Sequence, residues 1–270
     1  MPLLSRILAA ALMALALAAP AAPAAAGTIK LTTTAQAKLE GGRLSVEVQI
    51  VNQGDEAAQN LSLKLISAGQ QVEAPGPATL PPNQPSKTSL TMAVDVPSPG
   101  TYPAVILVRF HDLNGYPFTS LANALYYRDS PTFAQVSGRG LPSAVAGEGE
   151  VAYEITAMGQ DPLKVAMHLY APQELTLGRD RLELDLPGRS KQNVSLPVKN
   201  FSALIGASYP VLAILEYEQA GQHFAAVAVA MVTLAQPPSA VARLTPYLYV
   251  AAGLLVLLVA WLQWRRRKAS

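Results

Sequence analysis

The sequence contains no cysteine, and this absence excludes several kinds of site. A chain without cysteine has no thiol nucleophile, no thiolate metal site, no cysteine-linked lipid and no disulfide. Small exported domains often depend on disulfides, so the domains of this chain must be held together by their hydrophobic cores. A disulfide-bridged immunoglobulin domain is excluded for the same reason.

Histidine and catalytic motifs are also scarce. The three histidines, His111, His168 and His223, are not paired at metal-ligand spacing. We expect His111 in a solvated turn, His168 at an outward strand position and His223 beside the matching turn of a repeat. Because no Gly-x-Ser-x-Gly elbow, His-x-Glu-x-x-His motif or phosphate-binding glycine loop is present, we expect no catalytic residue, metal site or cofactor. The chain is predicted not to be an enzyme.

The formal net charge of +2 comes from the two ends of the chain. Without Arg6 and the four basic residues at 265–268, 15 Lys and Arg face 18 Asp and Glu, which is a net charge of −3. The central part is therefore mildly acidic and has no basic stripe. We expect no nucleic-acid partner.

The N-terminus has the three parts of a secretory signal peptide. Arg6 supplies positive charge, residues 7–19 are apolar, and small residues precede Gly27. We predict a signal peptide at 1–26 with cleavage between Ala26 and Gly27. The alternative, an uncleaved anchor, would need a longer apolar run.

The C-terminus is predicted to cross a membrane. Residues 246–262 are apolar, and the predicted transmembrane helix at 246–264 is long enough to span a bilayer; 265–270 form a basic tail. Tyrosines and tryptophans at the two edges suit the headgroup layers, and the tail cations mark the cytoplasmic side. These anchor residues are Tyr247, Tyr249, Trp261, Trp264, Arg265, Arg266, Arg267 and Lys268.

This layout predicts a single-pass protein of the cytoplasmic membrane with its N-terminal part outside and its C-terminus in the cytoplasm. Residues 237–245 form a proline-containing stalk. A sorting signal that a transpeptidase removes has a similar layout. Because neither Leu-Pro-x-Thr-Gly nor Pro-Glu-Pro precedes the apolar stretch, we favour a permanent anchor in membrane lipid.

The exported part repeats itself. The stretch VEVQIVNQGDEAAQNLSLKL from Val46 aligns with VAYEITAMGQDPLKVAMHLY from Val151. Four anchors keep an offset of 105 to 107 residues: Gly54 with Gly159, Leu80-Pro81 with Leu186-Pro187, Tyr102-Pro103 with Tyr209-Pro210, and Gly115 with Gly221. An offset this constant indicates a duplication.

Each repeat alternates apolar and polar residues, as half-buried strands do. Leu44, Val46, Val48 and Ile50 alternate with polar residues, and Gly41-Gly42 before them suits a tight hairpin turn. We predict an all-β fold of two tandem immunoglobulin-like antiparallel β-sandwiches followed by one transmembrane helix. Module 1 is expected at 27–128, a linker with room for an edge strand at 129–147, and module 2 at 148–236.

The segments VNQGDEAAQNLSLKL and LPPNQPSKTSLTMAVDVPSPGTYPAVILV carry a family resemblance. They are similar to bacterial and archaeal cell-surface immunoglobulin-like modules of the CARDB and NEW3 type, with an Asn-x-Gly strand end, a Leu-Pro turn and a Gly-x-Tyr entry to a long strand. The resemblance covers 44–126 well and 151–234 less well. It implies adhesive, spacing or assembly parts and specifies no ligand.

We therefore predict a non-enzymatic extracytoplasmic scaffold or adhesion protein that binds another envelope or surface protein. The alternative is a cell-surface carbohydrate-binding protein, for which Tyr116 is the candidate ligand contact because aromatic rings stack on sugars. Asn60, Asn193 and Asn200 begin Asn-x-Ser sequons, whose modification depends on the source.

Overall fold

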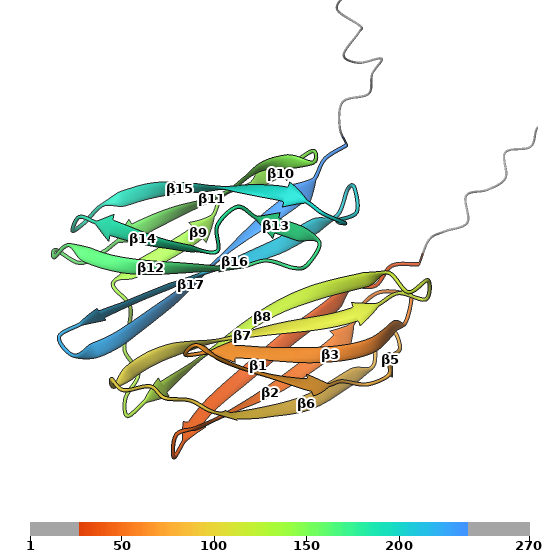
Figure 1. The fold of residues 1–270 in the computed structure, drawn as a ribbon, viewed down its shortest axis with the longest axis horizontal. Helices are drawn as coiled ribbons and strands as arrows, with labels where there is room; N and C mark the ends of the chain where they lie inside the picture. Colours follow the sequence, from red (N-terminus) through yellow and green to blue (C-terminus); the bar gives the residue numbers. More distant parts are fainter. Residues whose placement is uncertain (1–26, 237–270) are drawn as a thin grey trace, which may run out of the picture.

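The computed structural model describes residues 27–236, which form seventeen β-strands (Figure 1). The all-β prediction is confirmed for this part of the chain. Within 27–236, no helix has the length and apolar character needed to cross a membrane. The predicted signal peptide (1–26), stalk (237–245), span (246–264) and tail (265–270) lie outside the described residues.

The first module is defined here as strands β1 to β8. One sheet has the order β1-β2-β6, and the other has the order β4-β3-β7-β8, with β5 paired to β3. The strands are β1 (Leu31–Glu40), β2 (Arg43–Asn52), β3 (Ala58–Ser67), β4 (Gln70–Pro75), β5 (Thr79–Leu80), β6 (Pro85–Ala93), β7 (Gly100–His111) and β8 (Pro117–Arg128).

The second module is defined as strands β9 to β17. One sheet has the order β13-β15-β11-β9, and the other has the order β14-β12-β16-β17, with β10 parallel to β17. The strands are β9 (Val136–Gly140), β10 (Ser143–Val145), β11 (Glu148–Ala157), β12 (Leu163–Tyr170), β13 (Leu175–Leu177), β14 (Arg181–Leu186), β15 (Lys191–Asn200), β16 (Ser208–Gln219) and β17 (Gln222–Leu234).

The aligned repeats fall on matching strands. Tyr102-Pro103 lies in β7 and Tyr209-Pro210 in β16, and both strands have 12 residues. The sheet β1-β2-β6 corresponds to β9-β11-β15, and β4-β3-β7-β8 corresponds to β14-β12-β16-β17. The two modules therefore have the same strand order, as a duplication requires.

Each module has its own core between its two sheets. Along β2, Leu44, Val46, Val48 and Ile50 are 0% to 1% exposed, and the residues between them point outward. The buried cluster of the first module runs from Leu44 to Tyr126, and that of the second from Val136 to Leu234. The alternation in sequence is thus the alternation between core and surface.

Two predicted connections can be compared with the structure. Gly41 and Gly42 form the β1–β2 turn with φ of 55° and 76°, which confirms the predicted hairpin turn. The segment predicted as a linker, 129–147, contains β9 and β10, which belong to the second module. The stretch between the last strand of one module and the first of the next is 129–135.

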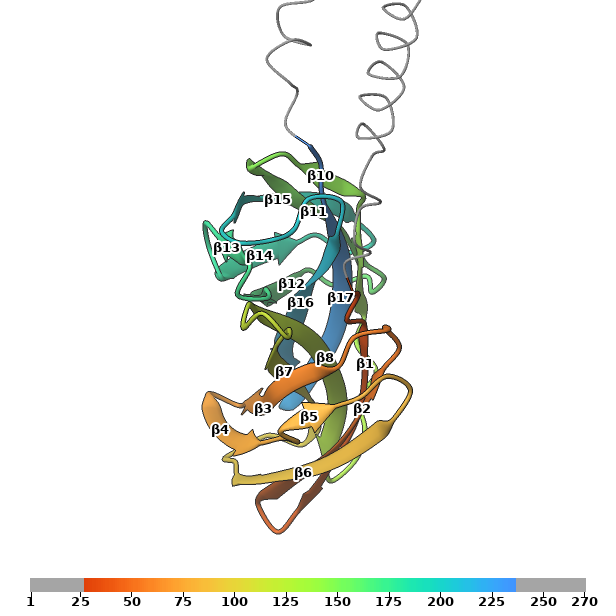
Figure 2. The same cartoon turned by 90° about the vertical axis from the view of Figure 1, so that its right-hand side faces the viewer.

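The modules lie side by side in opposite orientations (Figures 1 and 2). Strand β17 runs parallel to β7 where His223 meets Gly100, so β16, which is antiparallel to β17, runs opposite to its counterpart β7. Both ends of the described chain consequently lie at one end of the molecule. We call this the terminal end; the β1–β2 and β16–β17 turns lie at the opposite end (Figure 1).

Candidate functional site between the modules

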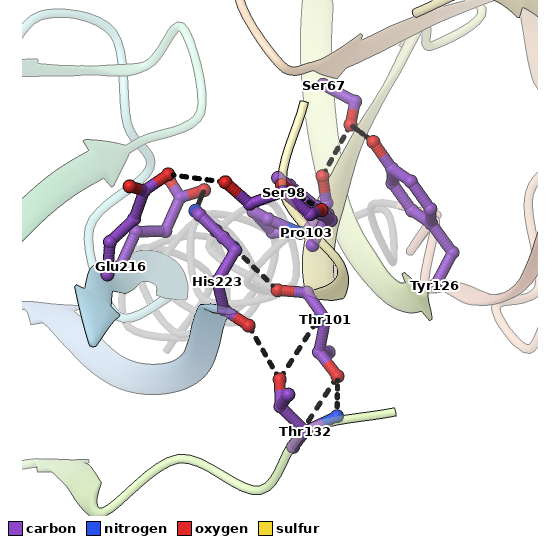
Figure 3. Close-up of polar contacts among 10 residues, drawn as sticks. Ser67, Ser98, Thr101, Pro103, Tyr126, Thr132, Glu216 and His223 are labelled. Atoms are coloured by element: carbon purple, nitrogen blue, oxygen red, sulfur yellow. Dashed lines mark hydrogen bonds and ion pairs between the residues drawn. The ribbon is translucent and has the colours of Figure 1, made fainter. Parts of the chain in front are cut away.

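The modules are joined at His223, near the start of β17, which lies beside Gly100 of β7. Figure 3 shows the hydrogen bonds of His223 with Thr101 and Thr132. The His223 backbone N–H donates to the Pro99 carbonyl oxygen at 2.9 Å, and the His223 carbonyl accepts from Thr132 Oγ1 at 2.6 Å. A Cβ at Gly100 would lie 2.1 Å from the His223 carbonyl oxygen, and φ there is +137°. Glycine is therefore required at this contact.

The His223 imidazole is buried between the modules, at 9% exposed. Its Nδ1 lies 2.8 Å from the Thr101 carbonyl oxygen, which can only accept, so Nδ1 carries the hydrogen. Its Nε2 faces Glu216 Oε1 at 3.5 Å. The ring stacks on Tyr102 with 3.9 Å between centroids and 6° between planes. One side chain of the second module thus contacts the backbone and an aromatic ring of the first.

Burial shifts both titratable groups of this junction toward their neutral forms. It lowers the pKa of His223 and raises the pKa of Glu216 to about 7. With Glu216 protonated and Nε2 unprotonated, this pair carries no charge. The junction is therefore sensitive to pH near neutrality.

An apolar seam continues the contact from the junction. Val105, Leu212 and Ile214 are at most 2% exposed and form a cluster of their own. Val105 aligns with Leu212, and Leu107, which packs against the cluster, aligns with Ile214 at the same offset of 107. Equivalent faces of the two copies therefore meet, as in an isologous dimer. The partly buried residues around the cluster are Leu107, Leu121, Tyr170 and Val227.

A buried carboxyl lies on the other side of the seam. Glu174, in the loop before β13, is 1% exposed, and its Oε1 accepts the Thr119 backbone N–H of β8 at 2.9 Å. Its Oε2 and Thr119 Oγ1 have no hydrogen-bond partner within the described part of the chain. Burial raises the pKa of Glu174. This contact joins the modules again, near the terminal end.

Between Glu174 and the terminal end the modules separate around a cleft of about 610 Å³. Both modules line it, and Thr33, Thr119 and Glu174 contribute buried polar atoms without hydrogen-bond partners in the described part of the chain. Within this lining, the cleft offers apolar surface and three carboxyls, those of Glu56, Asp112 and Glu174. Its residues do not pair a nucleophile with a base. The main apolar lining residues are Ile29, Leu31, Phe118, Leu121, Leu204 and Tyr209.

The predicted ligand contact, Tyr116, lies in the β7–β8 turn at the terminal end and is 67% exposed. The other exposed tyrosine of this strand pair, Tyr127, is eleven positions further along β8. At 3.3 Å per residue they are about 35 Å apart and form no common stacking platform. Gly27, the predicted first residue after cleavage, lies beside Glu56 at the mouth of the cleft.

The other predicted site residues cannot be placed. Ala26 and the anchor residues Tyr247, Tyr249, Trp261, Trp264, Arg265, Arg266, Arg267 and Lys268 lie outside the described residues. Within 27–236, His, Asp and Glu side chains form no group of three that could hold a metal ion.

Sequence reasoning missed His223, Glu216 and Glu174. His223 does lie beside the β16–β17 turn, as expected, but the first module covers it, which that expectation did not include. A signal was present, however: AVILV in β7 and VLAIL in β16 are apolar on both faces, which is typical of strands buried on both sides. These runs indicated that the outer faces of β7 and β16 are covered.

No protein-family model matches the sequence, and no curated protein matches it either. Among solved structures, native Escherichia coli alpha-2-macroglobulin is similar at 13% identity and a TM-score of 0.31, over 77% of this chain and 17% of that one. Salmonella alpha-2-macroglobulin reacted with methylamine is 10% identical with a TM-score of 0.32, over 77% of this chain and 16% of that one. Red sea bream transglutaminase is 13% identical with a TM-score of 0.28, over 77% of this chain and 31% of that one. The chain spans less than a third of each of these proteins, and likeness at these scores carries no argument about function.

Proposed function

We propose that the chain is a non-enzymatic scaffold, anchored in the cytoplasmic membrane, which holds two immunoglobulin-like modules outside the membrane to bind another envelope protein. The observation that carries this proposal is the inverted packing of the modules. It brings both ends of the described chain to the terminal end and leaves the opposite end free (Figure 1). An anchored module pair would therefore present that opposite end away from the membrane.

The opposite end offers a surface for a protein partner. Phe133 is 86% exposed and Met158 is 55% exposed. They are close because the Met158 backbone N–H donates to the Gln135 carbonyl oxygen at 2.8 Å. Exposed aromatic and methionine side chains are enriched where proteins bind each other. The resemblance to surface modules of the CARDB and NEW3 type supports the same role.

Photo-crosslinking in the native envelope tests partner binding. A photoreactive residue at Phe133 should capture one defined protein, and the same residue at Lys87, exposed on β6 further from the opposite end, serves as a control. Capture of one partner from Phe133 but not from Lys87 supports the proposal. Equal, diffuse capture from both positions would argue against a binding surface at the opposite end.

The anchored topology has its own test. Protease added outside spheroplasts should digest both modules, because they lie outside the membrane. Protection of 27–236 from that protease contradicts the assignment. The carbohydrate alternative rests on the exposure of Tyr116; saturable glycan binding that Tyr116→Ala abolishes would favour it over a protein scaffold.

A further inference from the structure

Exposed apolar side chains gather at the terminal end. Five of the eleven large apolar residues exposed in 27–236 lie there, on the β7–β8 turn (112–116) and the β15–β16 loop (201–207). Each is 56% to 78% exposed, so water contacts most of its surface. We call these five residues the apolar rim: Leu113, Tyr116, Phe201, Leu204 and Ile205.

Hydrogen bonds fix both loops of the apolar rim in place. In the β7–β8 turn, Asp112 Oδ1 accepts the backbone N–H of Asn114 at 2.9 Å and that of Tyr116 at 2.8 Å. In the β15–β16 loop, the Leu204 N–H donates to Tyr209 Oη at 3.0 Å, and the Gly206 N–H donates to the Leu234 carbonyl at 2.7 Å. The apolar side chains are therefore held outward by ordered backbone and exposed at a considerable cost in hydration.

The duplication supplies an internal control. The counterpart of the β15–β16 loop is the β6–β7 loop at 94–99, where the apolar residues Val94 and Val96 are buried at 8% and 5% exposed. The counterpart of the β7–β8 turn is Ala220-Gly221, which has no large side chain. The fold therefore does not require exposed large apolar side chains on these loops, and among these four loops they occur only in the two at the terminal end.

The position of the apolar rim identifies what covers it. The β15–β16 loop is bonded to Leu234, close to the last described residue, Gln236. The nine residues 237–245 then precede the apolar stretch from 246, and at full extension they reach about 30 Å. A bilayer holding that stretch would face the terminal end from a short distance. The tether also raises the local concentration of membrane surface near the rim.

We propose that the apolar rim rests in the headgroup layer of the membrane that anchors the chain; this inference rests on the membrane anchoring proposed above. Tyrosine and phenylalanine rings at Tyr116 and Phe201 suit the headgroup layer, and Leu204 and Ile205 suit the acyl boundary. The carboxylates of Asp55, Glu56 and Asp112 lie at the same end, so contact is shallow. The scaffold would then stand on the bilayer at a fixed height with the cleft mouth at its surface.

The absence of cysteine makes a direct test practical. Single cysteine substitutions in the full chain are labelled with a nitroxide, the protein is reconstituted in phosphatidylcholine–phosphatidylglycerol nanodiscs, and collision rates with oxygen and with a water-soluble nickel chelate are measured. The reporter is Ile205→Cys at the apolar rim. The matched control is Met158→Cys, because the two side chains are 57% and 55% exposed at opposite ends. A third label, Leu254→Cys, reports on the predicted span.

The proposal predicts an oxygen-to-nickel collision ratio several times higher at Ile205→Cys than at Met158→Cys, with Leu254→Cys higher still. Equal ratios at Ile205→Cys and Met158→Cys, with a lipid-like ratio at Leu254→Cys, would overturn the rim contact and leave the anchor intact. A water-like ratio at Leu254→Cys would overturn the anchor and the rim contact together. Low collision rates with both reagents at Ile205→Cys would show that a protein covers the rim, which also overturns the proposal.

Discussion

The two modules share a fold and differ in what they bring to their common interface. Their apolar contributions are equivalent, since Val105 aligns with Leu212 and Leu107 with Ile214. Their polar contributions are not. The second module supplies the ionisable side chains Glu174, Glu216, Glu218 and His223, whereas the first supplies backbone carbonyls, one N–H and the Ser98 hydroxyl.

This difference shows how two similar modules can pack against each other in one specific register. Two equivalent apolar faces can pack in several registers, because the hydrophobic effect has no direction. Buried polar groups fix one register, because any other leaves them without partners. The counterpart of Glu216 is Arg109, which pairs with Glu73 at the surface, so this ionisable group of the interface has no equivalent in the first module.

The largest effect is expected where the modules approach most closely. Gly100→Ala would place a Cβ against the His223 carbonyl oxygen, and we expect it to destabilise the chain by about 3 to 5 kcal/mol. Gly115→Ala is the control, because φ is also positive there (+82°) but nothing lies within 4 Å of the added Cβ. It should cost only about 1 kcal/mol. Urea unfolding of the purified full chain measures both, and similar costs would contradict a tight contact at Gly100.

Truncating aligned side chains of the apolar seam should destabilise the protein by different amounts. Ile214→Ala removes a fully buried side chain and should cost about 3 kcal/mol. Leu107→Ala, at the aligned position, removes a side chain that is only partly buried and should cost less. The same unfolding measurement compares them. A larger cost for Leu107→Ala would mean that the seam is centred elsewhere.

Glu216 should make stability depend on pH. Its pKa is raised from 4.5 to about 7, so its contribution is fully present below pH 4.5 and is lost as pH rises through about 7. From that shift the loss is at most about 3 kcal/mol. Glu216→Gln keeps the shape and cannot ionise, so its unfolding free energy should fall less than that of the unaltered chain between pH 4.5 and 8.

His223 should change the pH dependence of stability in the opposite direction to Glu216. Its pKa is lowered, so its contribution is present above pH 6.5 and is lost as pH falls. Both proteins in the Glu216→Gln comparison contain His223, so its contribution largely cancels in the difference. Identical pH profiles for the two proteins would show that Glu216 does not titrate in this range.

The smallest effect is expected at Glu174. Glu174→Ala leaves the Thr119 N–H without its acceptor and should cost about 1 to 3 kcal/mol. Glu174→Gln retains an acceptor oxygen and should cost less than about 1 kcal/mol. Thermal unfolding of the two variants checks that Glu174→Ala is the more destabilising. The reverse result would show that the Glu174–Thr119 hydrogen bond does not stabilise the interface.

The strands could be predicted from the sequence, and the interface could not. Alternation along β2 and the glycines at 41–42 define local structure, because they depend only on neighbours in the chain. Glu216 alternates outward just as a solvated residue does, and it is partly buried only because the first module packs against that face of β16. The aligned Tyr-Pro pairs predicted the matching strands β7 and β16. No local sequence pattern predicts that one module packs in the opposite orientation to the other.

The central claim is that the two copies form one body with β7 against β17. In the purified full chain, nitroxides at Ser98→Cys and Glu218→Cys report on this directly, because Ser98 Oγ donates to Glu218 Oε1 at 3.3 Å across the junction. Pulsed electron double resonance should give one short, narrow distance distribution. A broad distribution extending to long distances, as from two modules moving independently about 129–135, would contradict the account.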